Sequence, residues 1–171
     1  MIEIRSASID DIPAMREVAI ESYVEKFSQY NTPENMEAFL KEAYSLEQLT
    51  KEFYEPESQL TLAFSDNLVV GFVRLRKNNE VDHYLGNNHI ELQRLYVHPG
   101  FQNQKIGKML MESAMQYAMK GQFEWIWLGV WEHNTEAQRF YQRWGFEKFS
   151  EHVFQMGDDP QIDWLLKKKL K

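Results

Sequence analysis

An apolar run, a polar loop and the start of a helix follow one another in residues 89–108, which read HIELQRLYVHPGFQNQKIGK. The run His89–Val97 is rich in β-branched, aromatic and other apolar residues, which predicts a strand. Apolar residues then recur at helical spacing, which predicts a helix over 104–120 that ends at Gly121. The first N–H groups of a helix lack intrahelical partners and favour anions, so this loop is a candidate phosphate site.

Lys105 and Lys108 add positive charge at this helix start, and Gly107 lies between them. Gly107 has two interpretations, because a glycine here either permits close packing or lets a ligand approach the backbone. The established phosphate-loop, dinucleotide and serine-hydrolase motifs are absent from the sequence. The loop alone is therefore weak evidence of a site, and the rest of the chain must supply the context.

The remaining pattern is that of one α/β (α+β) domain over residues 1–171, without a repeat or a linker. Capping residues predict three helices that begin near Ser8, Thr32 and Ser45. A hairpin is predicted through Asp66–Asn67, and the polar stretch 78–88 is predicted to be a loop. The other predicted elements are strands at 2–5, 59–65, 68–77, 125–130, 152–156 and 162–170 and a helix at 134–144.

Composition narrows the function classes. The 171 residues carry a net charge of −7, which argues against nonspecific nucleic-acid binding. There is no cysteine, no apolar run of membrane-spanning length and no leader pattern, so a protein of the cytoplasm without membrane attachment is expected. The five histidines are scattered, and no metal site is expected. Residues 1–60 hold 13 acidic and 5 basic side chains, and residues 61–171 hold 13 and 14.

A second motif lies in residues 127–146, which read WLGVWEHNTEAQRFYQRWGF. It resembles the N-x-x-A-x-x-F-Y-x-x-x-G-F hallmark of the GCN5-related N-acetyltransferase (GNAT) superfamily. The segment 91–99, ELQRLYVHP, is similar to that family's E-L-x-x-L-Y-V-x-P strand. The family's Q/R-x-x-G-x-G/A loop falls on Gln102, Lys105 and Gly107, with lysine in place of the first glycine. The resemblance extends over nearly the whole chain.

The resemblance implies a mixed, mostly antiparallel central sheet of about seven strands flanked by helices. The strands 89–97 and 125–130 would splay apart to form the acetyl-CoA cleft. Main-chain groups of Leu95, Tyr96 and Val97 would then pair with the pantetheine arm, and Asn134 would hydrogen-bond to it. The pyrophosphate would be held by the N–H groups of Gln102, Asn103, Gln104, Lys105, Ile106, Gly107 and Lys108.

Two residues match catalytic positions of the family. Tyr141 matches the general acid for the departing thiolate, although an aromatic side chain packed against Phe140 and Trp144 is the alternative. Glu91 matches a general base that acts directly or through water, and an ordinary strand carboxylate is the alternative. Simple alternation puts Glu91 on the face of Leu95, unless a bulge shifts it. Without cysteine, direct transfer in a ternary complex is expected.

The substrate is expected to be a small cationic amine. Segments 33–36, 127–132 and 156–158 resemble the bacterial spermidine/spermine N-acetyltransferase (PaiA-type) branch, which implies a polyamine acceptor. Acidic helices of the first 60 residues would border that acceptor. The alternatives are acetylation of a protein or peptide and, because of Lys105, a non-catalytic acyl-CoA-binding regulatory module. Either a monomer or a homodimer is compatible with the sequence.

Overall fold

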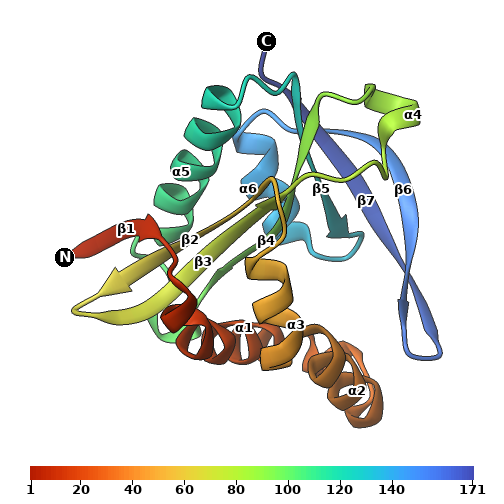
Figure 1. The fold of residues 1–171 in the computed structure, drawn as a ribbon. Coiled ribbons are helices and arrows are strands. Elements are labelled where there is room, and N and C mark those ends of the chain that lie inside the picture. The colour runs from red at the N-terminus through yellow and green to blue at the C-terminus, as the bar shows by residue number, and fades with distance from the viewer.

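One sheet runs through the molecule in the strand order β1-β2-β3-β4-β5-β7-β6 (Figure 1). The computed structural model describes every residue from Met1 to Lys171. The seven strands are β1 (Ile2–Ser6), β2 (Ser58–Ser65), β3 (Leu68–Arg76), β4 (His89–Val97), β5 (Trp125–Trp131), β6 (Glu147–Met156) and β7 (Asp159–Lys169). The six α-helices are α1 (Ile12–Phe27), α2 (Pro33–Ala43), α3 (Leu46–Phe53), α4 (Asp82–Leu85), α5 (Ile106–Lys120) and α6 (Thr135–Arg143).

All neighbouring strands are antiparallel except β4 and β5, which run parallel. These two strands pair only through His89–Trp125, Ile90–Ile126 and Glu91–Trp127. Beyond Glu91 the two strands have no further pairing, although each continues for several residues. The expected mixed sheet of seven strands with one splayed pair is therefore confirmed.

Helices lie on both faces of the sheet (Figure 1), and an apolar core fills each face. On one face α5 and α6 cover a core that includes Leu110, Ile126 and Phe146. On the other face α1, α2 and α3 cover a second core, in which Ile12 and Phe72 are buried. The sheet therefore has a helix layer on each side, and the opening between β4 and β5 connects to both layers.

The predicted helix starts are confirmed where the capping side chain lies directly before the helix. The Thr32 hydroxyl accepts the Asn35 N–H and begins α2, as predicted. The Ser45 hydroxyl accepts the Gln48 N–H and begins α3 in the same way. Asp66 and Asn67 both have positive φ, which gives a two-residue hairpin turn between β2 and β3.

The prediction that 78–88 is only a loop is wrong, because α4 lies within it. Val81 and Leu85 are four residues apart and bury their side chains against Trp127 and Leu165. That contact with distant strands stabilises a single helical turn in a stretch that is otherwise polar. No helix of the chain is both long enough and apolar enough to cross a membrane.

Candidate active site

A cleft of about 750 Å³ opens where β4 and β5 separate. Its walls come from β4, β5, β6 and β7, from α6 on one side and from α1, α2 and α3 on the other. Glu91, Leu95, Tyr96, Asn134 and Tyr141, all expected site residues, line this one space. The structure therefore brings together residues that are up to 50 positions apart in the sequence.

The loop before α5 presents a run of free backbone donors. None of the N–H groups from Gln102 to Lys108 donates to a protein acceptor. The first helical bond of α5 runs from the Met109 N–H to the Lys105 carbonyl at 3.1 Å. Asn103 and Lys105 have positive φ values of 67° and 61°, which turn the chain sharply just before the helix. Such a run of N–H groups at a helix N-terminus suits a phosphate or pyrophosphate.

Gly107 leaves open space next to this run. A Cβ atom built there would lie 3.9 Å from its nearest neighbours, Phe140 and Val97, which is ordinary contact. Close packing within the protein therefore does not require this glycine. The interpretation that it leaves room for a ligand fits the structure better, because the neighbouring N–H groups are also without partners.

The main chain of β4 is open toward β5 at Leu95 and Val97. The His98 N–H donates to the Val70 carbonyl at 2.8 Å, so Tyr96, two residues before it, also directs its main-chain groups to β3. Leu95 and Val97 then point theirs at the opening, where the Val97 carbonyl accepts the Ser22 hydroxyl at 3.4 Å. These two residues offer the edge of a strand to an extended ligand.

A bulge in β4 changes which side chains share a face. Arg74 pairs with Arg94 and Leu75 with Leu92, so Gln93 is an extra residue in β4. Leu95 consequently packs into the core under α5, whereas Tyr96 packs on the face of α1. The alternation that put Glu91 on the face of Leu95 is wrong for this reason.

Glu91 is held at the point where the strands separate. Its Oε2 atom accepts the Arg76 Nε–H at 2.5 Å and the Asn78 amide at 2.7 Å. Its side chain is 10% exposed, and Oε1 has no hydrogen-bond partner in the protein. No buried polar side-chain atom of the protein lacks a partner, so Oε1 must be accessible from the cleft.

Tyr141 packs as an aromatic residue of the core and also lines the cleft. Its ring packs against Phe140 and Phe146, with centroids 5.3 Å and 5.8 Å away. The residue is 9% exposed, and its hydroxyl has no hydrogen-bond partner although it lines the cleft. Burial raises the pKa of the phenol, so the hydroxyl keeps its proton throughout the neutral range.

Asn134 is the N-cap of α6. Its Oδ1 atom accepts the Ala137 N–H at 3.2 Å. The side-chain amide N–H groups have no protein acceptor and lie at the lining of the cleft. The cap therefore fixes which end of this side chain is available to a ligand, namely a donor.

A buried ion-pair network under the acceptor side of the cleft was not anticipated from the sequence. Glu52 of α3 binds Arg94 of β4 through both oxygens, at 2.7 Å and 3.1 Å. Arg74 donates to the Glu52 carbonyl, to Glu55 and to Gln93 in the bulge. Burial favours the neutral form of Glu52, but the hydrogen bond and charge of Arg94 outweigh it and lower the pKa of this carboxyl.

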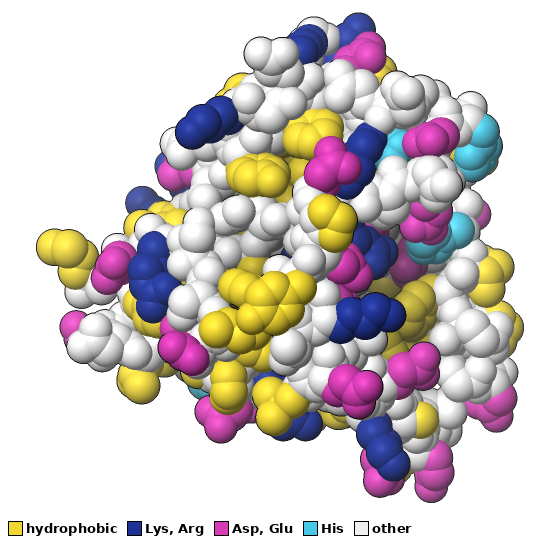
Figure 2. All heavy atoms as spheres, in the orientation of Figure 1, with side chains coloured by type: hydrophobic (Ala, Val, Ile, Leu, Met, Phe, Trp, Pro, Cys, Tyr) yellow, Lys and Arg dark blue, Asp and Glu magenta, His cyan; other side chains and the backbone are white.

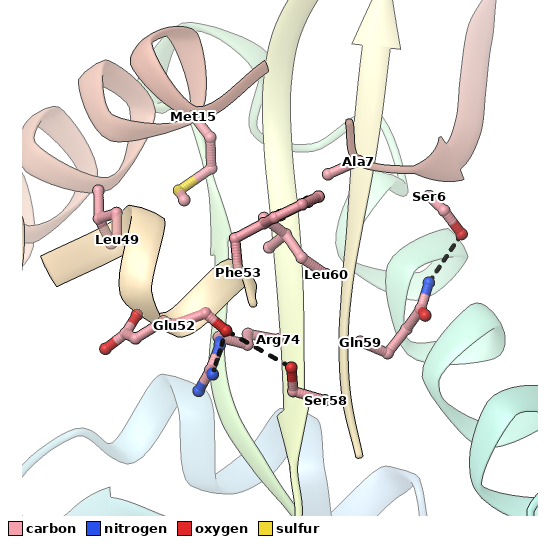
Figure 3. A pocket seen from close by; sticks show the side chains of 10 residues that line it. All are labelled: Ser6, Ala7, Met15, Leu49, Glu52, Phe53, Ser58, Gln59, Leu60 and Arg74. Atoms are coloured by element: carbon pink, nitrogen blue, oxygen red, sulfur yellow. Dashed lines mark hydrogen bonds between the residues drawn. The ribbon is translucent and has the colours of Figure 1, made fainter. Parts of the chain in front are cut away.

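The Glu52–Arg74 contact also separates the cleft from a second, smaller space. This cavity of about 150 Å³ lies between α1, α3 and β2, and Glu52 lines both spaces (Figure 3). Figure 3 shows Arg74 turned toward the Glu52 main chain, with Ser58 bound to the same carbonyl. The network thus fixes α3 to β3 and β4 behind the cleft.

The acidic helices contribute less directly than the sequence suggested. Figure 2 shows Asp and Glu side chains along the lower rim of the molecule, over α1, α2 and α3. Of the 13 acidic residues in the first 60, only Glu42 and Glu52 line the cleft. Further carboxylates come from Glu80, Glu91 and Asp163. No group of three or more potential ligand side chains in the chain could hold a metal ion.

The cleft is lined by the edge residue Leu95 and by the Tyr141 phenol, whereas Val97 and the free N–H groups of residues 102–108 lie outside its lining. The profile of the acetyltransferase (GNAT) family matches residues 13–146. The chain therefore belongs to this family, and it is an acyltransferase that takes its acetyl group from acetyl-CoA.

Relatives match along the whole chain. An uncharacterised N-acetyltransferase of Lactobacillus delbrueckii subsp. lactis is 35% identical over 99% of this chain and 98% of its own length. Spermidine N(1)-acetyltransferase of Thermoplasma acidophilum is 31% identical over 98% of this chain and 97% of its own length. The crystal structure of the PaiA N-acetyltransferase of Thermoplasma acidophilum in complex with coenzyme A has a TM-score of 0.83 at 29% identity. That comparison covers 99% of each chain.

Proposed function

We propose that this enzyme transfers the acetyl group of acetyl-CoA to a primary amine of a polyamine, such as spermidine or spermine. The observation that carries the proposal is the full-length similarity to a spermidine N(1)-acetyltransferase. The acidic rim of α1, α2 and α3 supports it, because a polycation is attracted to such a surface. Glu42, Glu80 and Asp163 extend that charge into the cleft.

The residues present fit coenzyme A. The free N–H groups from Gln102 to Lys108 suit its pyrophosphate, and Lys105 and Lys108 contribute positive charge. The open main-chain groups of Leu95 and Val97 suit the amides of the pantetheine arm, as an added strand would. Tyr96 lies between these two residues, and its side chain lines the cleft. The Asn134 amide N–H groups remain available to donate, because the cap uses only the Oδ1 atom as an acceptor.

Bound acetyl-CoA supplies an activated acetyl group, and the protein supplies the proton transfers. An amine arrives as an ammonium ion and must lose a proton before it can attack a carbonyl carbon. The free Oε1 of Glu91 takes that proton, directly or through a water molecule, while Arg76 and Asn78 hold the carboxylate in place. The Tyr141 hydroxyl gives its proton to the departing sulfur.

Transfer is direct, from donor to acceptor in one ternary complex. The chain has no cysteine that could carry an acetyl group as a thioester. The opening between β4 and β5 brings both ligands to one place, because the cofactor edge and the acceptor face border the same cleft.

A coenzyme A release assay tests the substrate. The panel should contain spermidine, spermine, butylamine, free amino acids, an aminoglycoside and lysine peptides at matched concentrations. We expect kcat/KM to be greatest for a polyamine. A peptide as the best substrate would identify the enzyme as a protein acetyltransferase instead. Equal rates with butylamine and spermidine would contradict polyamine specificity.

A further inference from the structure

The carboxylates that line the cleft are not equally neutralised. Glu52 is paired with Arg94 at 2.7 Å, and Glu91 with Arg76 at 2.5 Å. The other three, Glu42, Glu80 and Asp163, form no ion pair with a lysine or arginine. Glu80 and Asp163 both face His152, whose Nδ1 is 3.2 Å from Glu80 and whose Nε2 is 3.3 Å from Asp163. We call Glu80, His152 and Asp163 the His152 triad.

The triad assembles from three separate parts of the chain. Glu80 lies in the segment between β3 and β4, His152 in β6 and Asp163 in β7. His152 and Asp163 are direct cross-strand partners, and Asp163 is also opposite Trp131 of β5. All three residues line the same cleft as Glu91 and Tyr141. The triad is therefore part of the lining of the candidate active site.

Gly129 leaves the triad uncovered. It lies in β5 two residues past Trp127, the last residue that pairs with β4. It is exposed, whereas its neighbours Leu128 and Val130 are buried. A Cβ atom there would lie 3.6 Å from His152 Nε2 and 3.7 Å from Asp163 Oδ2. A glycine inside a strand weakens it and is typical of a position where a ligand comes close.

His152 lies between the two carboxylates, one on each ring nitrogen. Neutral imidazole has a single N–H, so only the protonated ring can donate to Glu80 and to Asp163 together. The hydrogen bond to Asp163 raises the pKa of His152, and the charges of Asp163 and Glu80 add to this, against a smaller effect of burial. When the ring is protonated, the two carboxylates hold one positive group between them.

A second polar group of the cleft has no partner within the protein. The Tyr141 hydroxyl, on a residue that is 9% exposed, has no partner in the protein although it lines the same space. No fully buried polar side-chain atom of the protein lacks a partner, so this hydroxyl is accessible and can bond to a bound molecule. Tyr141, Gly129 and the triad line the same cleft, so one extended molecule can contact all of them.

We propose that Glu80 and Asp163 form a second cation subsite, which holds an ammonium group of the acceptor other than the one that is acetylated. This inference rests on the proposed amine acetyltransferase function and names the part of the site that recognises a second charge. In the free enzyme the His152 ring takes the place of that ammonium. When a diamine or polyamine binds, its ammonium donates to both carboxylates and the ring moves aside. Monoamines have no group for this subsite.

Equilibrium binding tests the subsite without requiring turnover. Calorimetric titrations on the enzyme saturated with coenzyme A should compare spermidine with butylamine. We expect wild type to bind spermidine at least about tenfold more tightly, and Asp163→Asn and Glu80→Gln each to remove most of that difference. Affinity for butylamine and for coenzyme A should change less than about twofold. Glu34→Gln on α2, outside the cleft, is the matched control.

Two further variants separate charge from shape. Gly129→Ala should cover the triad and weaken spermidine binding more than butylamine binding. His152→Gln removes the competing cation and should leave spermidine binding equal or tighter. The subsite is refuted if wild type binds the two amines equally, or if Asp163→Asn weakens both alike. Failure of the enzyme to acetylate any amine would instead count against the proposed function, because binding is measured separately.

Discussion

The Arg76 side chain donates to Glu91 at 2.5 Å, at the last residue where β4 still pairs with β5. Asn78 donates to the same oxygen, so one oxygen of the carboxylate is held and the other is free toward the cleft. The bulge at Gln93 lies two residues further along β4. Because of this extra residue, Arg94 and Tyr96 lie on the same face of the sheet as Glu91. The position of the expected base is therefore set by two neighbours, Arg76 and Asn78, and by the extra residue Gln93 in the strand.

Replacement of Glu91 by glutamine should remove the base and keep the size of the side chain. We expect kcat/KM to fall by about 10²–10⁴-fold near pH 7. The loss should become smaller at higher pH, because more of the amine is then already deprotonated. Steady-state rates from pH 6 to pH 10 check this. Coenzyme A affinity should not change, and Glu37→Gln, on α2 and outside the cleft, is the control. A loss that is the same at every pH would mean that Glu91 acts only through structure.

Replacement of Tyr141 by phenylalanine should remove the proton donor and keep the aromatic packing with Phe140 and Phe146. We expect kcat to fall by about 10²-fold or more, with little change in the affinity for acetyl-CoA. Pre-steady-state turnover together with a binding titration separates the two quantities. Tyr117→Phe in α5, away from the cleft, is the matched control. Unchanged turnover in Tyr141→Phe would remove this residue from the mechanism.

Lys105 gives a prediction in which stability and binding change in opposite directions. Its φ of 61° disfavours any side chain, so Lys105→Gly should stabilise the fold by about 1 kcal/mol and raise Tm by about 2–4 °C. The same change removes a positive charge beside the phosphate loop and should weaken coenzyme A binding about threefold at low salt. Lys105→Ala should weaken binding equally without the gain in Tm. Thermal melts and titrations at two salt concentrations measure both effects. Tighter binding in Lys105→Gly would show that backbone shape matters more than charge here.

Glu52 gives a prediction about acid stability. Its pKa is lower in the folded protein than the ordinary value of 4.5, since Arg94 outweighs the effect of burial. The stabilisation is therefore complete above pH 4.5 and is lost as the pH falls through the folded value. Glu52→Gln leaves Arg94 buried and unpaired and should cost about 3 kcal/mol at pH 7. Denaturant unfolding at pH 7 and at pH 3 should show that the difference from wild type shrinks in acid. Glu47→Gln, exposed on the same helix, should change stability very little.

Much of this architecture was predictable because its signals are local. Thr32, Ser45 and Asp66–Asn67 act on residues within three positions of themselves, and the structure has each as expected. The opening between β4 and β5 was predicted from the resemblance to the GNAT family, which rests on the two segments 91–99 and 127–146. The short helix α4 was missed because the partners of Val81 and Leu85 are residues of β5 and β7.

The acceptor side was the least predictable part of the site. The bulge at Gln93 cannot be read from alternation, because one extra residue leaves the apolar pattern on either side intact. Arg94 reads as an exposed strand residue until Glu52, 42 positions earlier, is placed against it. The charge excess of the first 60 residues was correctly counted, but its distance from the cleft depends on how the helices fold.

Only three residue pairs join β4 to β5, and this has a consequence for how the molecule comes apart. The sheet consists of a four-stranded block, β1 to β4, and a three-stranded block, β5 to β7, with a narrow seam between them. A bound cofactor that lies along the seam adds contacts to both blocks and to neither alone. Such a ligand acts as a missing strand, and we expect it to make the two blocks unfold as one cooperative unit.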